Sequence, residues 1–161
     1  MFEVILAVAA LALIGIDHLT KYLAVRFLMP LDTFPIIQGV LHLTYAENTG
    51  AAFSMFRGQA WLLSGVTAVV LALLAVVIVK KMFPARLSMI ALTMIFAGGV
   101  SNLIDRVFRH YVVDFIDFRL INFAIFNFAD MCVSIGCALF ILSLLIIETK
   151  KRGQKKTAAK S

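Results

Sequence analysis

Long apolar runs dominate the hydrophobic pattern of this chain. Four of them, at about 4–28, 61–79, 87–104 and 131–147, approach the length of a membrane-spanning helix. A helix needs about 20 mostly apolar residues to cross ~30 Å of hydrocarbon, and it satisfies its own backbone hydrogen bonds there. The pattern therefore predicts an all-α membrane protein with four transmembrane helices. A single apolar run could instead be a core helix of a soluble protein, but four such runs in 161 residues argue against that interpretation.

The segment after the first run carries a weaker, alternating pattern. Between residues 41 and 45 apolar and polar side chains take turns, which predicts a half-buried strand. Asn48 and Gly50 follow, and both are residues that favour a turn. We therefore expect a small β platform beside the helices, on the extracytoplasmic side. Three further apolar residues could rest on lipid there or pack under a loop: Phe53, Met55 and Phe56.

Composition extends the membrane assignment to the whole chain. Of the residues, 62% are hydrophobic and only 15% are charged, and the mean hydropathy is +0.99. A soluble domain is closer to half apolar and about a quarter charged. We therefore expect one integral-membrane domain over residues 1–161, because little chain remains for a second domain.

Positive charge is concentrated in two stretches and predicts the orientation. Three of the 15 Lys and Arg residues lie at 80–86 and six lie in the tail 148–161. Lys and Arg are enriched in cytoplasmic segments, so both stretches and both termini are expected in the cytoplasm. The segments 29–60 and 105–130 then lie outside. The net charge of +6 thus reflects topology, and a basic tail beside anionic lipid explains it better than a nucleic-acid partner does.

Polar residues inside the apolar spans need a reason to be there. Asp17 and Lys21 are four residues apart, so they share one helix face and are expected to pair near the outer interface. The cation would keep Asp17 ionised and therefore unfit as an acid. At the outward end of the third span, Asn102, Asp105 and Arg106 cluster. We expect Asp105 to form a structural ion pair, with Arg106 or with another partner.

Gly98 and Gly99 lie on the same span as that polar cluster. Small residues let two helix backbones approach closely in a membrane. We therefore expect another helix to pack against this part of the third span.

Two aspartates suggest chemistry. Asp114 lies in the segment 111–118, and Asp130 lies at the mouth of the fourth span. A carboxylate at a membrane boundary is costly unless it faces protein or water, so it indicates function. Two carboxylates that converge can share a proton, one acting as base and the other as acid. The pair predicts aspartic protease chemistry at a membrane surface. Asp117 would point away from Asp114 in an extended segment, and we expect it to face solvent.

Other chemistries have little support in the sequence. Cys132 and Cys137 are five residues apart on one expected helix, so they point to different faces and are not expected to form a disulfide. No base lies near either in the sequence, so we expect them to pack in the core rather than to act as thiol nucleophiles. The three histidines are scattered and match no metal-binding motif: His18, His42 and His110. We therefore expect no metal site and no cofactor.

Five short motifs occur in order along the chain. They are Asp17-His-Leu-Thr-Lys21, Asn48-Thr-Gly-Ala-Ala-Phe-Ser54, Gly98-Gly-Val-Ser-Asn-Leu-Ile-Asp-Arg106, Val112-Val-Asp-Phe115 and Phe126-Asn-Phe-Ala-Asp130. Together, over about residues 17–147, they resemble the motifs of the bacterial lipoprotein signal peptidases, the type II signal peptidases. One departure is His18, where the family often has Gln.

The resemblance implies an intramembrane aspartyl endopeptidase of the bacterial cytoplasmic membrane. Such enzymes remove the signal peptide from diacylglyceryl-modified prolipoproteins, just before the lipidated cysteine, without a cofactor. By the match, Asp114 and Asp130 would be the catalytic pair. The implied partners are the lipid-modified substrate and membrane lipid, with no nucleic acid; the oligomeric state stays open and a monomer is compatible with it. The match also assigns residues that line or support the site: Asn48, Asn102, Arg106 and Asn127 as lining residues, and Asp17, Lys21, Gly50 and Asp105 as supporting residues.

Two alternative functions remain. A transporter or channel could use buried Asp, Lys and Arg as an ion or proton relay. A relay would distribute its charges through the depth of the membrane, whereas here most of them gather at the outer ends of the spans. A membrane scaffold without enzymatic activity would leave the paired aspartates beside Asn and Arg unexplained.

Overall fold

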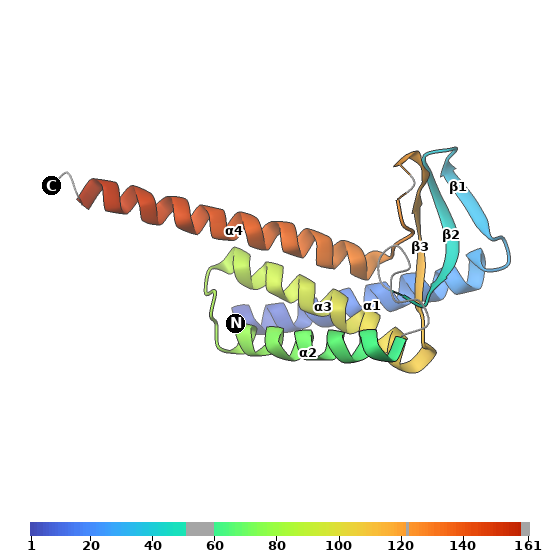
Figure 1. Cartoon of the computed structure of the whole chain (residues 1–161), viewed down its shortest axis with the longest axis horizontal. Helices are drawn as coiled ribbons and strands as arrows, with labels where there is room; N and C mark the ends of the chain where they lie inside the picture. Colours follow the sequence, from blue (N-terminus) through green and yellow to red (C-terminus); the bar gives the residue numbers. More distant parts are fainter. Residues whose placement is uncertain (51–59, 122, 159–161) are drawn as a thin grey trace.

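Four long helices and a small sheet make up the part of the chain that the computed structural model describes, residues 1–50, 60–121 and 123–158. The helices lie side by side, and the sheet stands across one end of them (Figure 1). Each helix is long and apolar enough to cross a membrane. This architecture confirms the predicted fold class. The helices are α1 (Phe2–Leu23, continued by the π-helical turn η1, Ala24–Leu28), α2 (Ala60–Val79), α3 (Arg86–Arg109) and α4 (Phe128–Ala158).

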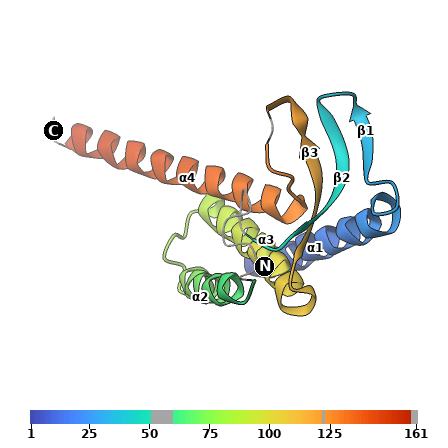
Figure 2. The same ribbon diagram turned by 45° about the vertical axis from the view of Figure 1, so that its right-hand side comes forward.

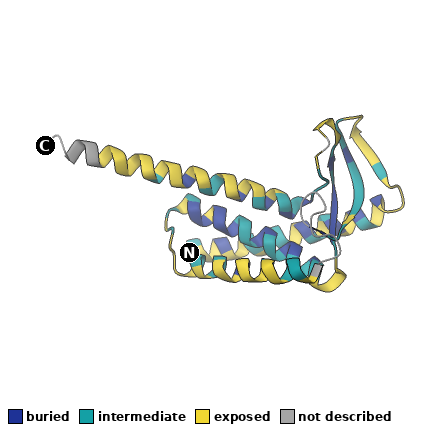
Figure 3. Ribbon diagram, viewed as in Figure 1, coloured by how far each residue is buried: buried dark blue, intermediate teal, exposed yellow. Residues whose placement is uncertain are grey.

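The surface of the helix bundle is apolar, as hydrocarbon requires. Much of helix α2 is exposed (Figure 3), and its large side chains Trp61 and Leu73 are 76% and 64% exposed. In water such a surface would favour aggregation, whereas in a bilayer it contacts lipid. Helix α3 is the exception, because the other three helices cover much of it.

Glycines set the distance between α3 and its neighbours. A Cβ atom at Gly98 would collide with the carbonyl oxygen of Ala129 on α4. One at Gly99 would lie 2.8 Å from a methyl carbon of Leu71 on α2. Both contacts agree with the close approach expected at these two glycines, and both depend on the missing side chain.

Helix α4 is longer than its apolar run. It starts at Phe128 and continues to Ala158, so the first part of the basic tail is helical. Beyond Ile147 most residues are polar, but many of them, such as Glu148, Lys150 and Arg152, are good helix formers. Glu148 also accepts a hydrogen bond of 2.9 Å from Arg152 one turn later. The helix was expected to end near residue 147 because the apolar residues end there, but the helix itself continues past that point.

The sheet has three antiparallel strands in the order β1 (Thr33–Ile37), β2 (Leu41–Asn48) and β3 (Val112–Phe118). A bulge between Leu43 and Ala46 brings Ala46 opposite Asp114. A 3₁₀ turn, η3 (Arg119–Ile121), follows β3. The sheet is attached to the end of α1 by an apolar cluster whose buried members are Ala24, Leu28, Val113 and Phe115.

The start of α1 and the end of α4 lie on the side of the molecule away from the sheet (Figure 1). The connection between α2 and α3 also lies away from the sheet (Figures 1 and 2). Lys81 in that connection forms an ion pair with Glu3 near the start of α1. The two basic stretches of the chain therefore share one end of the molecule.

Candidate active site

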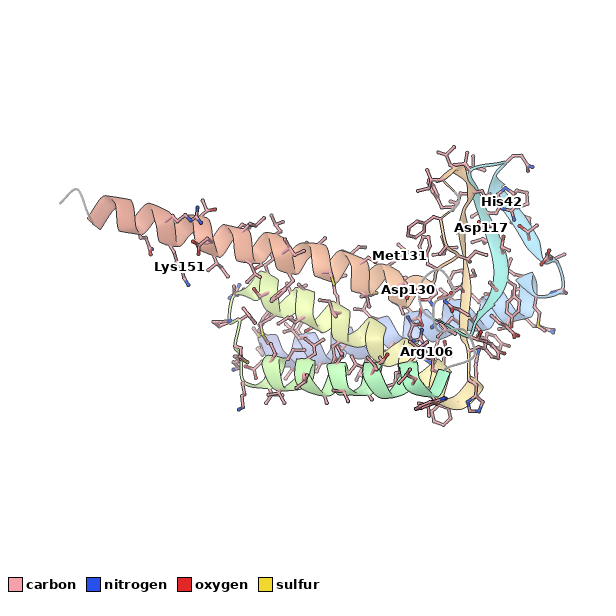
Figure 4. All side chains as sticks on the ribbon, in the orientation of Figure 1. His42, Arg106, Asp117, Asp130, Met131 and Lys151 are labelled. Carbon is pink, nitrogen blue, oxygen red and sulfur yellow. The ribbon has the colours of Figure 1, made fainter. Side chains whose placement is uncertain are left out.

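Asp114 and Asp130 meet where the sheet joins the helices. Asp114 lies on β3 and is 2% exposed, and Asp130 lies in the first turn of α4 (Figure 4). One residue contacts both. The side-chain amide of Asn127 donates to Oδ1 of Asp114 at 2.6 Å, and the backbone N–H of Asn127 donates to Oδ2 of Asp130 at 3.1 Å. We call Asp114 and Asp130 the dyad.

The local sequence at the start of α4 fixes Asp130. Asn127 precedes the helix, and its side-chain oxygen accepts the backbone N–H of Asp130 at 2.9 Å. Together with the bond from the Asn127 N–H to the Asp130 carboxylate, this makes a reciprocal capping box. The same four residues that start the helix therefore also orient one aspartate of the dyad.

Two further amides hold the remaining carboxylate oxygens. Asn48 at the end of β2 donates to Oδ2 of Asp114 at 2.9 Å, and Asn102 on α3 donates to Oδ1 of Asp130 at 2.8 Å. The side-chain oxygen of Asn48 accepts the N–H of Gly50 at 3.0 Å, which agrees with the turn expected there. All four oxygens of the dyad thus accept a hydrogen bond from this chain.

Arg106 places a cation beside the dyad. It is on α3, and its guanidinium donates to the carbonyl oxygen of Gly50 at 3.2 Å and approaches that of Asn102 at 3.5 Å (Figure 4). In the described part of the chain it forms no ion pair with either aspartate of the dyad. Its charge therefore remains available to a group that binds beside the dyad.

A buried lysine contacts three polar residues next to the dyad. Lys21 is 1% exposed, and its ammonium lies 2.7 Å from Asp17 and 2.7 Å from Asp105. It also donates to the side-chain oxygen of Asn102 at 2.8 Å. The pairing of Asp17 with Lys21 agrees with the sequence-based expectation. Of the two alternatives for Asp105, the structure supports another partner, because its ion pairs are with Lys21 and, at 3.7 Å, with Arg109 rather than with Arg106.

Asp17 links α1 to α4. Its Oδ1 accepts the backbone N–H of Ala129 at 2.7 Å, which is one of the N–H groups that the first turn of a helix leaves unpaired. Its Oδ2 accepts the hydroxyl of Ser101 at 2.6 Å. Sequence analysis missed both contacts. For Ser101, the sequence offered only its hydroxyl side chain within the Gly98–Arg106 motif. The contact with Ala129 is made by a backbone N–H, which the amino-acid sequence does not reveal.

One connected network contains every residue that the sequence analysis assigned to the site. Hydrogen bonds or ion pairs connect Asp17, Lys21, Asn48, Gly50, Asn102, Asp105, Arg106, Asp114, Asn127 and Asp130.

Asp114 is poised to hold a proton near neutral pH. Burial, and then the negative charge of Asp130, raise the pKa of Asp114 to about 7, although hydrogen bonds from Asn48 and Asn127 oppose the shift. A carboxyl group with such a pKa occupies both protonation states at neutral pH, which is what acid and base catalysis requires.

The expectation that Asp117 faces solvent is wrong. Asp117 is 8% exposed and lies opposite His42 in the sheet (Figure 4). It accepts hydrogen bonds from Arg119 at 2.7 Å and from Thr44 at 2.8 Å. Burial works to raise the pKa of Asp117, but the bonds from Arg119 and Thr44 outweigh it, and the pKa lies below its usual value. Asp117 points away from Asp114, as expected, and ties two strands together.

Other candidate residues contribute no second site in the described part of the chain. There, no group of three or more His, Cys, Asp or Glu side chains could hold a metal ion. Cys132 is a buried free thiol, whereas Cys137 is free and exposed, which corrects the core position expected for it. The expected lipid contacts fall outside the described residues, because they concern Phe53, Met55 and Phe56.

Comparisons with known proteins agree on one family. The family model described as "Signal peptidase (SPase) II" matches residues 9–146. A lipoprotein signal peptidase of Brevibacillus brevis is 36% identical over 143 residues, which cover 89% of this chain and 96% of the relative. One of Microcystis aeruginosa is 46% identical over 138 residues, which cover 84% and 88%. A solved bacterial membrane enzyme superposes with a TM-score of 0.84 at 32% identity, covering 91% of this chain and 90% of the other.

Proposed function

This chain belongs to the signal peptidase II family, and from that premise we propose that it is an aspartyl endopeptidase acting on diacylglyceryl-modified prolipoproteins. It removes the signal peptide by cutting just before the lipidated cysteine. The observation that carries the aspartyl mechanism is the convergence of Asp114 and Asp130 on Asn127. The chain acts as one integral-membrane domain and needs no cofactor.

The dyad performs the acid and base steps. One aspartate is ionised and takes a proton from a water molecule, whose oxygen attacks the carbonyl carbon of the scissile bond. The other is protonated and donates a hydrogen bond to the carbonyl oxygen. When the tetrahedral intermediate collapses, a proton passes to the leaving nitrogen and the C–N bond breaks. The pKa of about 7 for Asp114 supports this division, because it keeps a proton available beside a carboxylate.

The charges of the surrounding network support a single shared proton. Among the described residues, four acidic and three basic side chains belong to it, so with every group ionised these residues carry one excess negative charge. One proton on the dyad makes this described set neutral, which favours its burial at a membrane boundary. The groups are Asp17, Asp105, Asp114 and Asp130, and Lys21, Arg106 and Arg109.

Arg106 supplies the positive charge for the transition state. Negative charge develops on the carbonyl oxygen during attack, and a preorganised donor beside it is typically worth about 3–4 kcal/mol. Arg106 is held by two backbone oxygens rather than by a carboxylate of the dyad, so its charge is not neutralised there.

The position of the site suits a substrate held in the membrane by its own lipid. The sheet end of the molecule faces outward from the cytoplasmic membrane, and the dyad lies near the outer leaflet. Burying an acyl chain contributes about 0.8 kcal/mol per methylene group. The membrane therefore supplies much of the binding, and the protein has to present the bond before the lipidated cysteine to the dyad.

The decisive experiment compares two precursors and three variants in the same micelles. The purified chain should shorten a lipidated prolipoprotein on a gel, and mass spectrometry should place the cut before the modified cysteine. An unlipidated precursor of the same sequence should be cut far more slowly. Asp114→Asn and Asp130→Asn should each abolish cleavage, whereas Asp32→Asn, which removes an exposed carboxylate outside the network, should not. Turnover by either dyad variant would remove that residue from the mechanism, and equal rates for the two precursors would contradict the substrate assignment.

A further inference from the structure

The backbone of Ala129 is held from two sides. Its N–H donates to Oδ1 of Asp17 on α1 at 2.7 Å. Its carbonyl oxygen lies against the backbone of Gly98 on α3, where a side chain would not fit. Ala129 is 1% exposed and immediately precedes Asp130. The direction in which Asp130 leaves the helix therefore depends on the contact between Asp17 and the first turn of α4.

Ser101 is the hydroxyl that orients Asp17. It is fully buried on α3, one turn after Gly98, and donates to Oδ2 of Asp17 at 2.6 Å. Lys21 contacts the same oxygen, but its ammonium group also contacts Asp105 and Asn102. Its interaction with Asp17 is therefore shared with two other residues. The terminal torsion of an aspartate has a broad energy profile. Without Ser101, Oδ2 of Asp17 would keep its contact with Lys21 but lose the hydroxyl that opposes rotation of the carboxylate about that torsion.

The protons of this contact can be assigned from the donors present. The hydroxyl of Ser101 has a single proton, and it donates that proton to Oδ2 of Asp17. Nδ1 of His18 lies 2.9 Å from the Ser101 oxygen and 3.1 Å from the carbonyl oxygen of Ile14. Both neighbours are therefore acceptors, so Nδ1 carries the ring proton. His18 thus donates to Ser101, and Ser101 donates to Asp17.

From this geometry we infer that Ser101, oriented by His18, is a positioning residue for Asp130: it holds the Asp17 carboxylate against the N–H of Ala129. The expected effect of Ser101 on turnover rests on the proposed function. The contact itself is a property of the folded chain and can be measured without substrate.

The kinetic test compares two buried serines of α3. Ser101→Ala should lower kcat about tenfold and leave KM within twofold, because the dyad is displaced while the surface that holds the substrate is not. Ser88→Ala is the matched control, since Ser88 is also fully buried and shares a hydrogen bond of 2.7 Å with Ser143, far from the dyad. It should keep the wild-type kcat. A folded Ser101→Ala variant with wild-type kcat would overturn the inference.

The second test concerns the donor. His18→Gln keeps an N–H that can reach Ser101 and should retain kcat within twofold, whereas His18→Leu should lower it several-fold. If His18 acts through Ser101, the double variant His18→Leu/Ser101→Ala should be no slower than Ser101→Ala alone. Independent, multiplying losses would overturn the assigned order of contacts.

The third measurement needs no substrate and separates this inference from the proposed function. Hydrogen exchange of the Ala129 amide, followed by NMR with ¹⁵N-alanine in micelles, should be about tenfold faster in Ser101→Ala than in the wild type or in Ser88→Ala. Unchanged protection of that amide would overturn the contact. If protection falls as expected but wild-type protein cuts no lipidated precursor, the contact stands and the proposed function fails.

Discussion

The carboxyl group of Asp114 is buried beside another carboxyl group, so its contribution to stability depends on pH. Its pKa is about 7 in the folded chain and close to 3.9 when unfolded. Between these values the folded state binds more protons than the unfolded state, and the free energy of unfolding therefore falls as pH rises. Asp114→Asn removes this penalty.

We therefore predict that Asp114→Asn gains thermal stability over the wild type as pH rises from 5 to 8. A pKa unit corresponds to about 1.4 kcal/mol, so the shift in Tm should be a few degrees or more. Thermal unfolding of both proteins in micelles measures it, with Asp32→Asn as the control that should follow the wild type. A constant difference in Tm across this range would mean that Asp114 is ionised throughout.

Asp117 should matter for stability and not for chemistry. Asp117→Asn loses the charge that Arg119 and Thr44 bind, and it should lower the free energy of unfolding by about 1–2 kcal/mol at pH 7. Because the pKa of Asp117 is depressed, the wild-type advantage is present above its unfolded value and should vanish as pH falls through the lower folded value. Turnover at pH 7 should persist, and a folded but inactive variant would place Asp117 in the mechanism.

At the residue scale the sequence identifies side chains better than it identifies their partners. Motif order marks Asp17 and Asp130 separately, but their connection runs through the N–H of Ala129, which any residue except proline could supply. Asp117 was misplaced for a similar reason. Its partner Arg119 lies beyond the strand in a 3₁₀ turn, and an alternating pattern does not predict that the chain folds back there.

Close packing of α3 against α4 should be as important for turnover as the polar residues of the site. Gly98→Ala places a methyl group in collision with the carbonyl oxygen of Ala129, so the first turn of α4 must move. A displacement of about 1 Å at a catalytic group can cost a hundredfold in rate. We predict a loss of at least tenfold in kcat, measured with the lipidated precursor.

Gly65→Ala is the control for that prediction. Gly65 lies on α2, and a Cβ there would meet no atom within 4 Å. Alanine is the better helix former by about 1 kcal/mol, so this variant should be active and no less stable. Wild-type kcat in Gly98→Ala would show that α4 tolerates a wider spacing than the glycine implies.

At the scale of elements the four spans are predictable because lipid imposes a length and an apolar composition on each of them. Strand β3 is harder to predict. Five of its seven residues are buried, so it shows no alternation of apolar and polar positions. Strand β1 is mostly exposed and contains Pro35, which also weakens a strand pattern. Only β2, buried in part, left a readable signal.

The whole molecule has two chemically different ends. The basic connection of α2 and α3 and the end of α4 lie on one side, and the sheet lies on the other (Figure 2). The start of α1 is also on the side away from the sheet (Figure 1). We predict that a reporter fused after Lys150 reads cytoplasmic and that one in the segment around Thr33 reads external. A cytoplasmic signal from the Thr33 fusion would put the dyad on the wrong side for lipoproteins.

The ion pairs around Lys21 have a consequence for biosynthesis. Asp17 pairs with Lys21 and Asp105 with Arg109, each four residues along its own helix. As the nascent chain leaves the ribosome, α1 and α3 can therefore enter the bilayer one at a time, each carrying a partner for its own carboxylate. Asp130 belongs to the last span to be made, and Asn127 immediately precedes that span. On the proposed mechanism, hydrolysis has to await insertion of that span, and a chain truncated before it would have no complete dyad with which to damage the membrane proteins around it.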